Sequence, residues 1–251
     1  MMSLIRPDLG DLVGKQYKFK MRSYHGVFST LVLLQVVGIL LSFVGNDQYS
    51  EGMNDIWINL RYYSGDTIIG FTFLWIFING ILITTRAYRE EDFTFVTNRL
   101  SSHLANGLFI VTAGVIGGST SVFSGFVVKV LIRYIPKEGT IFAPEATLSL
   151  SVFLAGLFAT ILFMILCGMA GYLIGMIIQM HSGMVLVLPV LVMGFFLFAG
   201  SIGQEDILFR ITEFYGAETS VPKLFVKIIV TVGLMFGFTV VLSNRLEVRA
   251  S

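Results

Sequence analysis

The sequence predicts an all-α membrane protein with six transmembrane helices and with both termini in the cytoplasm. Three observations carry this prediction: an apolar composition, long runs without charge, and an uneven distribution of basic residues. Hydrophobic residues make up 55% of the 251 residues and charged residues only 13%, whereas a soluble globular domain carries about 25% charged residues. One soluble core cannot bury so much apolar surface, so lipid has to cover part of it.

Apolar runs place the individual spans, because a helix needs about 20 apolar residues to cross the hydrocarbon core. Ala146–Gln204 contains no charged residue and is long enough for two spans, with a turn at Gln179–Gly183. The runs are continuous rather than alternating, which favours helices over the strands of a membrane barrel. The four other predicted spans are Ser23–Asn46, Thr67–Thr85, Leu100–Val128 and Leu224–Leu242.

Basic residues predict the orientation, since cytoplasmic loops are enriched in Lys and Arg. Five basic residues precede the first span, and the loop after that span has a single arginine, Arg61, among several acids. The N-terminus is therefore expected in the cytoplasm, and an even number of spans returns the C-terminus to the same side. The five basic residues are Arg6, Lys15, Lys18, Lys20 and Arg22.

Residues 7–24 are predicted to form an amphipathic helix that lies in the inner membrane interface. Leu12, Val13, Tyr17 and Met21 fall near one helical stripe, and Lys18 falls elsewhere on the helix surface. Basic side chains of such a helix lie near anionic lipid head groups. The alternative is a basic flank that only sets the topology.

A charged segment, residues 89–103, separates the second and third predicted spans. Aromatic anchors within a charged rim are typical of a small protein interface, so this segment is the predicted docking site for a cytoplasmic partner. A solvated loop is the alternative. A membrane protease is disfavoured, because the spans offer no further acid or histidine pair. The residues that carry the prediction are Glu90, Glu91, Asp92, Phe93, Phe95 and Arg99.

Small and hydroxylated residues are concentrated in the third span, at Thr112, Gly117, Gly118, Ser119 and Ser121. Such residues let membrane helices approach closely and can form hydrogen bonds between helices. They predict helix packing, or alternatively the polar lining of a translocation path. Glycines in the fourth predicted span favour the same close packing; these are Gly156, Gly168, Gly171 and Gly175. Residues 204–222, which mix acidic and large apolar side chains, predict short extracellular helices.

Several kinds of chemistry are not expected from this chain. Gly14-Lys15 is followed by Gln16 rather than Ser or Thr, so the phosphate-binding loop of ATPases is absent. A single cysteine, Cys167, excludes an internal disulfide, and no zinc-binding spacing is found. A net charge of +1 gives no electrostatic footprint for nucleic acid. We therefore expect no catalytic residue, no metal site and no cofactor held by this chain.

The order of these segments resembles the membrane subunit of a type-2 ABC transporter, the exporter-type permease. The resemblance rests on the elbow helix at 7–24, six spans, a coupling segment at 89–103, short external helices at 204–222 and the basic tail SNRLEVRAS. The proline often found near the end of the coupling segment is missing, and Thr97-Asn98-Arg99 stands there.

The resemblance implies partners and a location. A dimer of a separate ATPase subunit would bind ATP and Mg and would dock on the coupling segment, with Phe93 and Phe95 as anchors and the charged residues as the rim. A second copy of the chain, or a sister permease, would complete the pore. The assembly would lie in a cell membrane, such as the bacterial plasma membrane. The cargo would be amphipathic or lipophilic, for example a peptide toxin, an antimicrobial peptide or a drug.

A secondary carrier or channel without an ATPase partner is the alternative function. It would be expected to have ionisable residues in the middle of its spans, or inverted repeats with broken helices. The sequence shows neither a charge at mid-span nor an obvious repeat.

Overall fold

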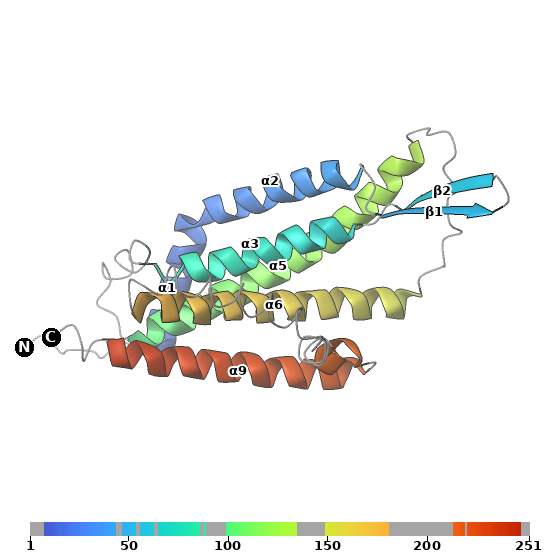
Figure 1. The fold of residues 1–251 in the computed structure, drawn as a ribbon. Coiled ribbons are helices and arrows are strands. Elements are labelled where there is room, and N and C mark those ends of the chain that lie inside the picture. Colours follow the sequence, from blue (N-terminus) through green and yellow to red (C-terminus); the bar gives the residue numbers. More distant parts are fainter. Residues whose placement is uncertain are drawn as a thin grey trace, which may run out of the picture.

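The computed structural model describes residues 8–43, 47–53, 56–62, 65–85, 88, 99–134, 149–180, 213–218 and 220–246. These residues form an elongated bundle of helices, with a β-hairpin at one end and α1 at the other (Figure 1). The helices are α1 (Leu9–Ser23), α2 (His25–Ser42), α3 (Asp66–Leu82), α5 (Arg99–Tyr134), α6 (Leu150–Met180) and α9 (Val221–Leu246).

The predicted spans correspond closely to the helices. α2, α3, α5, α6 and α9 cover the first, second, third, fourth and sixth predicted spans. The predicted fifth span lies outside the described residues. α5 continues beyond the predicted end at Val128 to Tyr134 and so includes Lys129. Long charged side chains at a helix end can reach the membrane surface, so a span can extend past its last apolar residue.

Length and composition indicate a membrane protein. Within the described residues, three helices are long and apolar enough to cross a bilayer: Arg99–Ile132, Leu150–Gln179 and Val221–Ser243. α1 and α2 are bent by 50° relative to each other and would count as a fourth span if taken together. α3 is apolar but has only 17 residues, so it rises about 26 Å against a hydrocarbon core of about 30 Å.

A β-hairpin that the sequence did not predict lies between α2 and α3. β1 (Asp47–Met53) pairs with β2 (Ile56–Tyr62) in antiparallel register, with Asp47 opposite Tyr62. The sequence of β2, IWINLRY, places Ile, Ile, Leu and Tyr at every second position, which is typical of a strand. The acids around it had been interpreted only as a sign of membrane orientation.

Glycines bring α3 and α6 into contact through their main chains. A side-chain carbon added at Gly171 would collide with the main chain of Phe77, and one added at Gly80 would collide with the main chain of Gly168. This is the largest helix contact of the described bundle. Small residues commonly permit such an approach between membrane helices, where lipid provides no hydrophobic driving force. The close packing expected in the fourth span is therefore present at Gly168 and Gly171, and also at Gly175.

α5 lies against both α3 and α6. Gly117 faces α3, where an added side-chain carbon would lie 3.2 Å from Thr72 Cγ2. Gly118 faces α6, where such a carbon would lie 3.0 Å from Ile161 Cα. Two consecutive glycines thus give α5 one close contact to each neighbour.

The outer faces of α2 and α9 carry large apolar side chains that no described residue covers. Leu33 is 68% exposed and Leu234 is 70% exposed. Similar side chains continue along both helices, at Val32, Val36 and Leu40 of α2 and at Val226, Val230 and Phe238 of α9. An apolar exterior of this kind is expected where lipid is the solvent.

We expect Gly171→Ala to destabilise the bundle, because its new methyl group would collide with the main chain of α3. Overpacking of this kind costs about 1–3 kcal/mol. Gly156→Ala is the matched control on the same helix, since no atom lies within 4 Å of an added carbon there. Thermal unfolding in detergent should show a lower Tm for Gly171→Ala and an unchanged or higher Tm for Gly156→Ala. Equal Tm values would contradict the close contact.

Candidate functional site

Of the predicted docking segment, residues 89–103, the structure describes 99–103, which form the first turns of α5. Glu90, Glu91, Asp92, Phe93 and Phe95 lie outside the described residues, and so does the rest of 89–98. Tyr88 precedes them, and Arg99, which is exposed, begins α5. The site is therefore described through the residues that contact Tyr88 and the first turns of α5.

The elbow helix residues lie partly against α5. Val13 is buried, while Leu12, Tyr17 and Met21 are half-buried and Lys18 is exposed. The hydroxyl of Tyr17 lies 2.9 Å from that of Thr112 in α5. The predicted stripe of residues is therefore present, but part of it packs against α5. Thr112, a candidate for a translocation path, is used in this contact.

Two polar residues of α1, Gln16 and Lys20, are buried, although Lys20 was expected only to be one of the basic residues that set the orientation. Gln16 is 2% exposed and Lys20 is fully buried. Neither amide atom of Gln16 has a hydrogen-bond partner among the described residues. The Lys20 ammonium lies 5.7 Å from the ring centre of Tyr24. The spacing 13, 16, 20 and 24 places these residues on one helical stripe, and this pattern in the sequence could have identified them.

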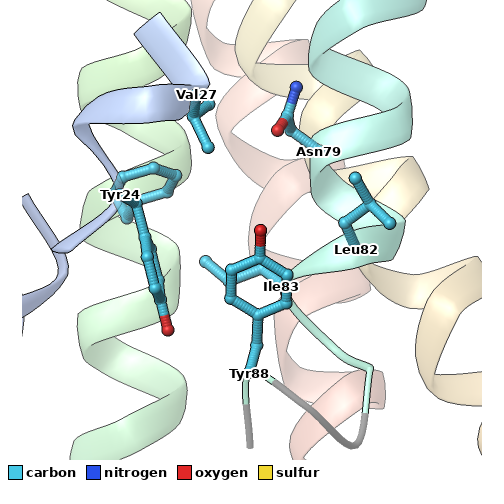
Figure 2. A pocket seen from close by; sticks show the side chains of 7 residues that line it. Tyr24, Val27, Asn79, Leu82, Ile83 and Tyr88 are labelled. Atoms are coloured by element: carbon cyan, nitrogen blue, oxygen red, sulfur yellow. The ribbon is translucent and has the colours of Figure 1, made fainter. Parts of the chain in front are cut away.

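The entry flank of the docking segment contacts the junction between α1 and α2. Tyr88 and Tyr24 meet edge to face, with 4.8 Å between ring centroids. A cavity of about 10 Å³ lies beside them, which is room for about one water molecule. Figure 2 shows the Tyr88 hydroxyl pointing into the space between α2 and α3, toward Asn79. The lining residues are Tyr24, Val27, Asn79, Leu82, Ile83, Tyr88 and Phe109.

The exit flank is joined to α6 by a buried polar cluster. His103 Nδ1 lies 2.6 Å from the hydroxyl of Tyr172, and the Asn106 amide nitrogen donates to the same hydroxyl at 3.2 Å. All three side chains are buried. Hydrogen bonds without competing water hold their partners in a defined geometry. The start of α5 is therefore held to α6 by directional bonds, and not by apolar contact alone.

A second polar contact lies deeper in the bundle and joins three helices. The Gln35 amide of α2 donates to Thr120 of α5 at 2.9 Å and to Thr72 of α3 at 3.4 Å. Each threonine hydroxyl donates in turn to a main-chain carbonyl of its own helix. The cluster contains no ionisable group, so it is suited to holding helices together.

The remaining third-span candidates take part in helix contacts. Gly117 and Gly118 face α3 and α6 as described above. Ser121 is buried and donates to the carbonyl of Gly118 at 2.9 Å, while Ser119 is half-buried. The structure brings these residues together along α5 in packing positions.

Only part of the predicted external segment is described. Residues 213–216 form one helical turn against α9. The Lys227 ammonium binds the Glu218 carboxylate at 2.7 Å and donates to the carbonyl of Phe214 at 2.9 Å. The hydroxyl of Tyr215 lies 2.9 Å from that of Thr231. The hydrogen bond from Lys227 lowers the pKa of Glu218, and the positive charges of Lys227 and Lys223 add to this effect.

The described residues contain no group of three His, Cys, Asp or Glu side chains that could hold a metal ion. Cys167 is half-buried in α6, with its sulfur 3.6 Å from the carbonyl of Phe73. Comparison with known protein families, with characterised proteins and with solved structures gives no match. A function for this chain therefore has to be argued from its own residues.

The contact between residues 213–218 and α9 should weaken in acid. The pKa of Glu218 is lower in the folded protein than in an unfolded chain, so its stabilising effect is complete above the ordinary value, which is about 4.3. That effect is lost as the pH falls through the lowered pKa. The protection of amides at 213–218, taken relative to the intrinsic exchange rate at each pH, should therefore fall below about pH 4.3. In Glu218→Gln, this protection should already be reduced at neutral pH and should no longer change in acid. An acid response that persists in Glu218→Gln would show that another group is responsible.

Proposed function

We propose that this chain is the transmembrane permease subunit of an ATP-driven ABC exporter and that a separate ATPase subunit powers it. The observation that supports this proposal most directly is the arrangement of helices at one end of the bundle. There α1 bends by 50° into α2 and packs on α5, beside the end of α3 and the start of α5. α3 ends and α5 begins at that end (Figure 1), and in the sequence the predicted docking segment, residues 89–103, starts after α3 and runs into the first turns of α5. An elbow helix next to a docking segment is the order that the permease resemblance implies.

The exposed face of α1 supports a cytoplasmic position for this end. Lys15, Lys18 and Arg22 are exposed. Basic residues beside a membrane helix favour the cytoplasmic side, where anionic lipids are enriched. The docking segment would then lie where an ATPase can reach it. Phe93 and Phe95 are proposed as its buried anchors, and Glu90, Glu91, Asp92 and Arg99 as its polar rim.

The course of the chain supports six spans. α6 and α9 run in the same direction, because Phe158 stacks on Phe225 near the start of both helices. Farther along, Val232 and Met235 of α9 pack against the core cluster that contains Met169 and Tyr172 of α6. α6 ends at the bundle end that holds α1, whereas α9 begins at the opposite end. A fifth span between them, which the charge-free run up to Gln204 predicts, is consistent with this arrangement of α6 and α9.

A second permease copy, or a sister permease, is proposed to complete the translocation path. The proposed cargo is amphipathic or lipophilic, such as a peptide toxin, an antimicrobial peptide or a drug, and an apolar exterior of this extent fits a path between helix bundles in lipid. The carrier alternative has less support. The buried ionisable residues Lys20 and His103 lie near one end of the bundle rather than at mid-span, where a coupling ion would be expected to bind.

Docking on the charged segment can be tested by removing its aromatic anchors. Purification of the tagged chain from its native membrane in mild detergent should retain a polypeptide with a Walker A motif, and the purified assembly should hydrolyse ATP. We expect Phe93→Ala/Phe95→Ala to reduce the retained ATPase at least about tenfold, because buried aromatic anchors each contribute about 2 kcal/mol or more to an interface.

Phe123→Ala/Phe126→Ala is the matched control. Its two phenylalanines are exposed on α5, far from the docking segment, and it should retain the ATPase fully. Equal retention by both double variants would contradict docking through Phe93 and Phe95. A wild-type chain that retains no ATPase would contradict the proposed function as a whole.

A further inference from the structure

One residue of α6 contacts both helices that flank the charged segment. Tyr172 is 1% exposed. Its main-chain nitrogen lies against Gly80 of α3, where an added side-chain carbon would lie 2.9 Å away. Its hydroxyl lies 2.6 Å from His103 Nδ1 and accepts from Asn106 at 3.2 Å, and both of these residues belong to α5. Because α3 precedes the segment and α5 follows it, both of its attachments meet α6 at Tyr172.

The hydroxyl of Tyr172 has two ways to complete its hydrogen bonds. When His103 Nδ1 carries no proton, Tyr172 donates to it and accepts from the amide nitrogen of Asn106. Asn106 Oδ1 then has no partner within the part of the chain that the structure describes. If the Asn106 amide turns over, its oxygen can accept from Tyr172 while a protonated Nδ1 donates to the tyrosine oxygen. Two bonding patterns on the same three residues are what a two-state element requires.

We propose that Tyr172 is the positioning residue that passes a displacement of the segment between α3 and α5 on to α6. This inference rests on the proposed function, because the displacement would come from an ATPase docked on that segment. When the first turns of α5 shift, His103 and Asn106 change their position relative to the tyrosine hydroxyl. Gly80 has no side chain that could adjust, and a close-packed interior transmits strain rather than absorbing it. α6 therefore has to move with the segment.

The other flank is less suited to this task. Tyr88 meets Tyr24 through an edge-to-face ring contact, which is less directional than a buried hydrogen bond. The cavity of about 10 Å³ beside this contact leaves some room for the rings to shift. A small displacement of Tyr88 can be absorbed there before it reaches α1 and α2. The path through Tyr172 has no comparable slack, because glycine on one side and short hydrogen bonds on the other hold the residue in place.

The test compares Tyr172→Phe with Tyr215→Phe in the complex with the ATPase. Tyr215 also makes a hydroxyl contact, 2.9 Å from Thr231, but it lies at the opposite end of the bundle. Spin labels at Leu108 of α5 and Leu154 of α6, both exposed, report the distance between these helices in a Cys167→Ala background. Double electron–electron resonance is recorded on the complex in nanodiscs, first without nucleotide and then after trapping with Mg-ATP and vanadate.

We expect trapping to change the distance between the labels in the spin-labelled complex without a further substitution, and also in the complex with Tyr215→Phe. In Tyr172→Phe the change should be lost although the ATPase is still retained, a combination that a general loss of stability would not produce. If Tyr172→Phe does not fold, Asn106→Ala is the second variant, since it removes the alternative acceptor and should also abolish the change.

The outcomes separate the two proposals. A full distance change in Tyr172→Phe or in Asn106→Ala would overturn the role of Tyr172 and leave the permease function standing. If trapping does not change the distance in the spin-labelled complex without a further substitution, the role of Tyr172 is overturned as well, because there is no movement to transmit. A chain that retains no ATPase would overturn both the permease function and the inference that rests on it.

Discussion

The glycine contact between α3 and α6 is the constraint on which the rest of the bundle depends. In lipid, apolar side chains gain little by leaving their surroundings, so close packing and hydrogen bonding have to hold helices together. Gly80, Gly168 and Gly171 remove the side chains that would keep the two main chains apart. With α3 and α6 in contact, α5 lies against both through Gly117 and Gly118. The positions of the other helices follow from this three-helix core.

The same contact determines where the polar residues meet. Tyr172 follows Gly171 directly, so the residue after the closest point of approach is also the one that reaches α5. Near this point lie the elbow between α1 and α2 and both flanks of the charged segment. A binding event on that segment would therefore act on a place where α1, α2, α3, α5, α6 and α9 converge. Stability and the proposed energy coupling thus share one location.

The sequence predicted the helices well and their lateral contacts poorly. A charged side chain in lipid is costly, so apolar runs with few charges indicate the positions of α2, α3, α5, α6 and α9, although the ends of α5 and α9 extend past them over Lys129 and Lys223. It did not reveal the hairpin, because the acids of β1 suggested only a loop, although β2 alternates as a strand does. Nor did it predict that Gln16 and Lys20 are buried. The spacing 13, 16, 20 and 24 places both on the stripe of Val13 and Tyr24, but the basic residues of this segment were interpreted only as a sign of orientation.

The proposed function requires that the charged segment lies in the cytoplasm and that the hairpin lies on the other side of the membrane. Single cysteines at Glu91 and at Ser50 of the hairpin, in a Cys167→Ala background, can be labelled with a membrane-impermeant maleimide. In intact cells the account predicts that Ser50→Cys is labelled and that Glu91→Cys is labelled only after permeabilisation. Labelling of Glu91→Cys in intact cells, with Ser50→Cys protected until permeabilisation, would place the segment outside the cell and contradict the account.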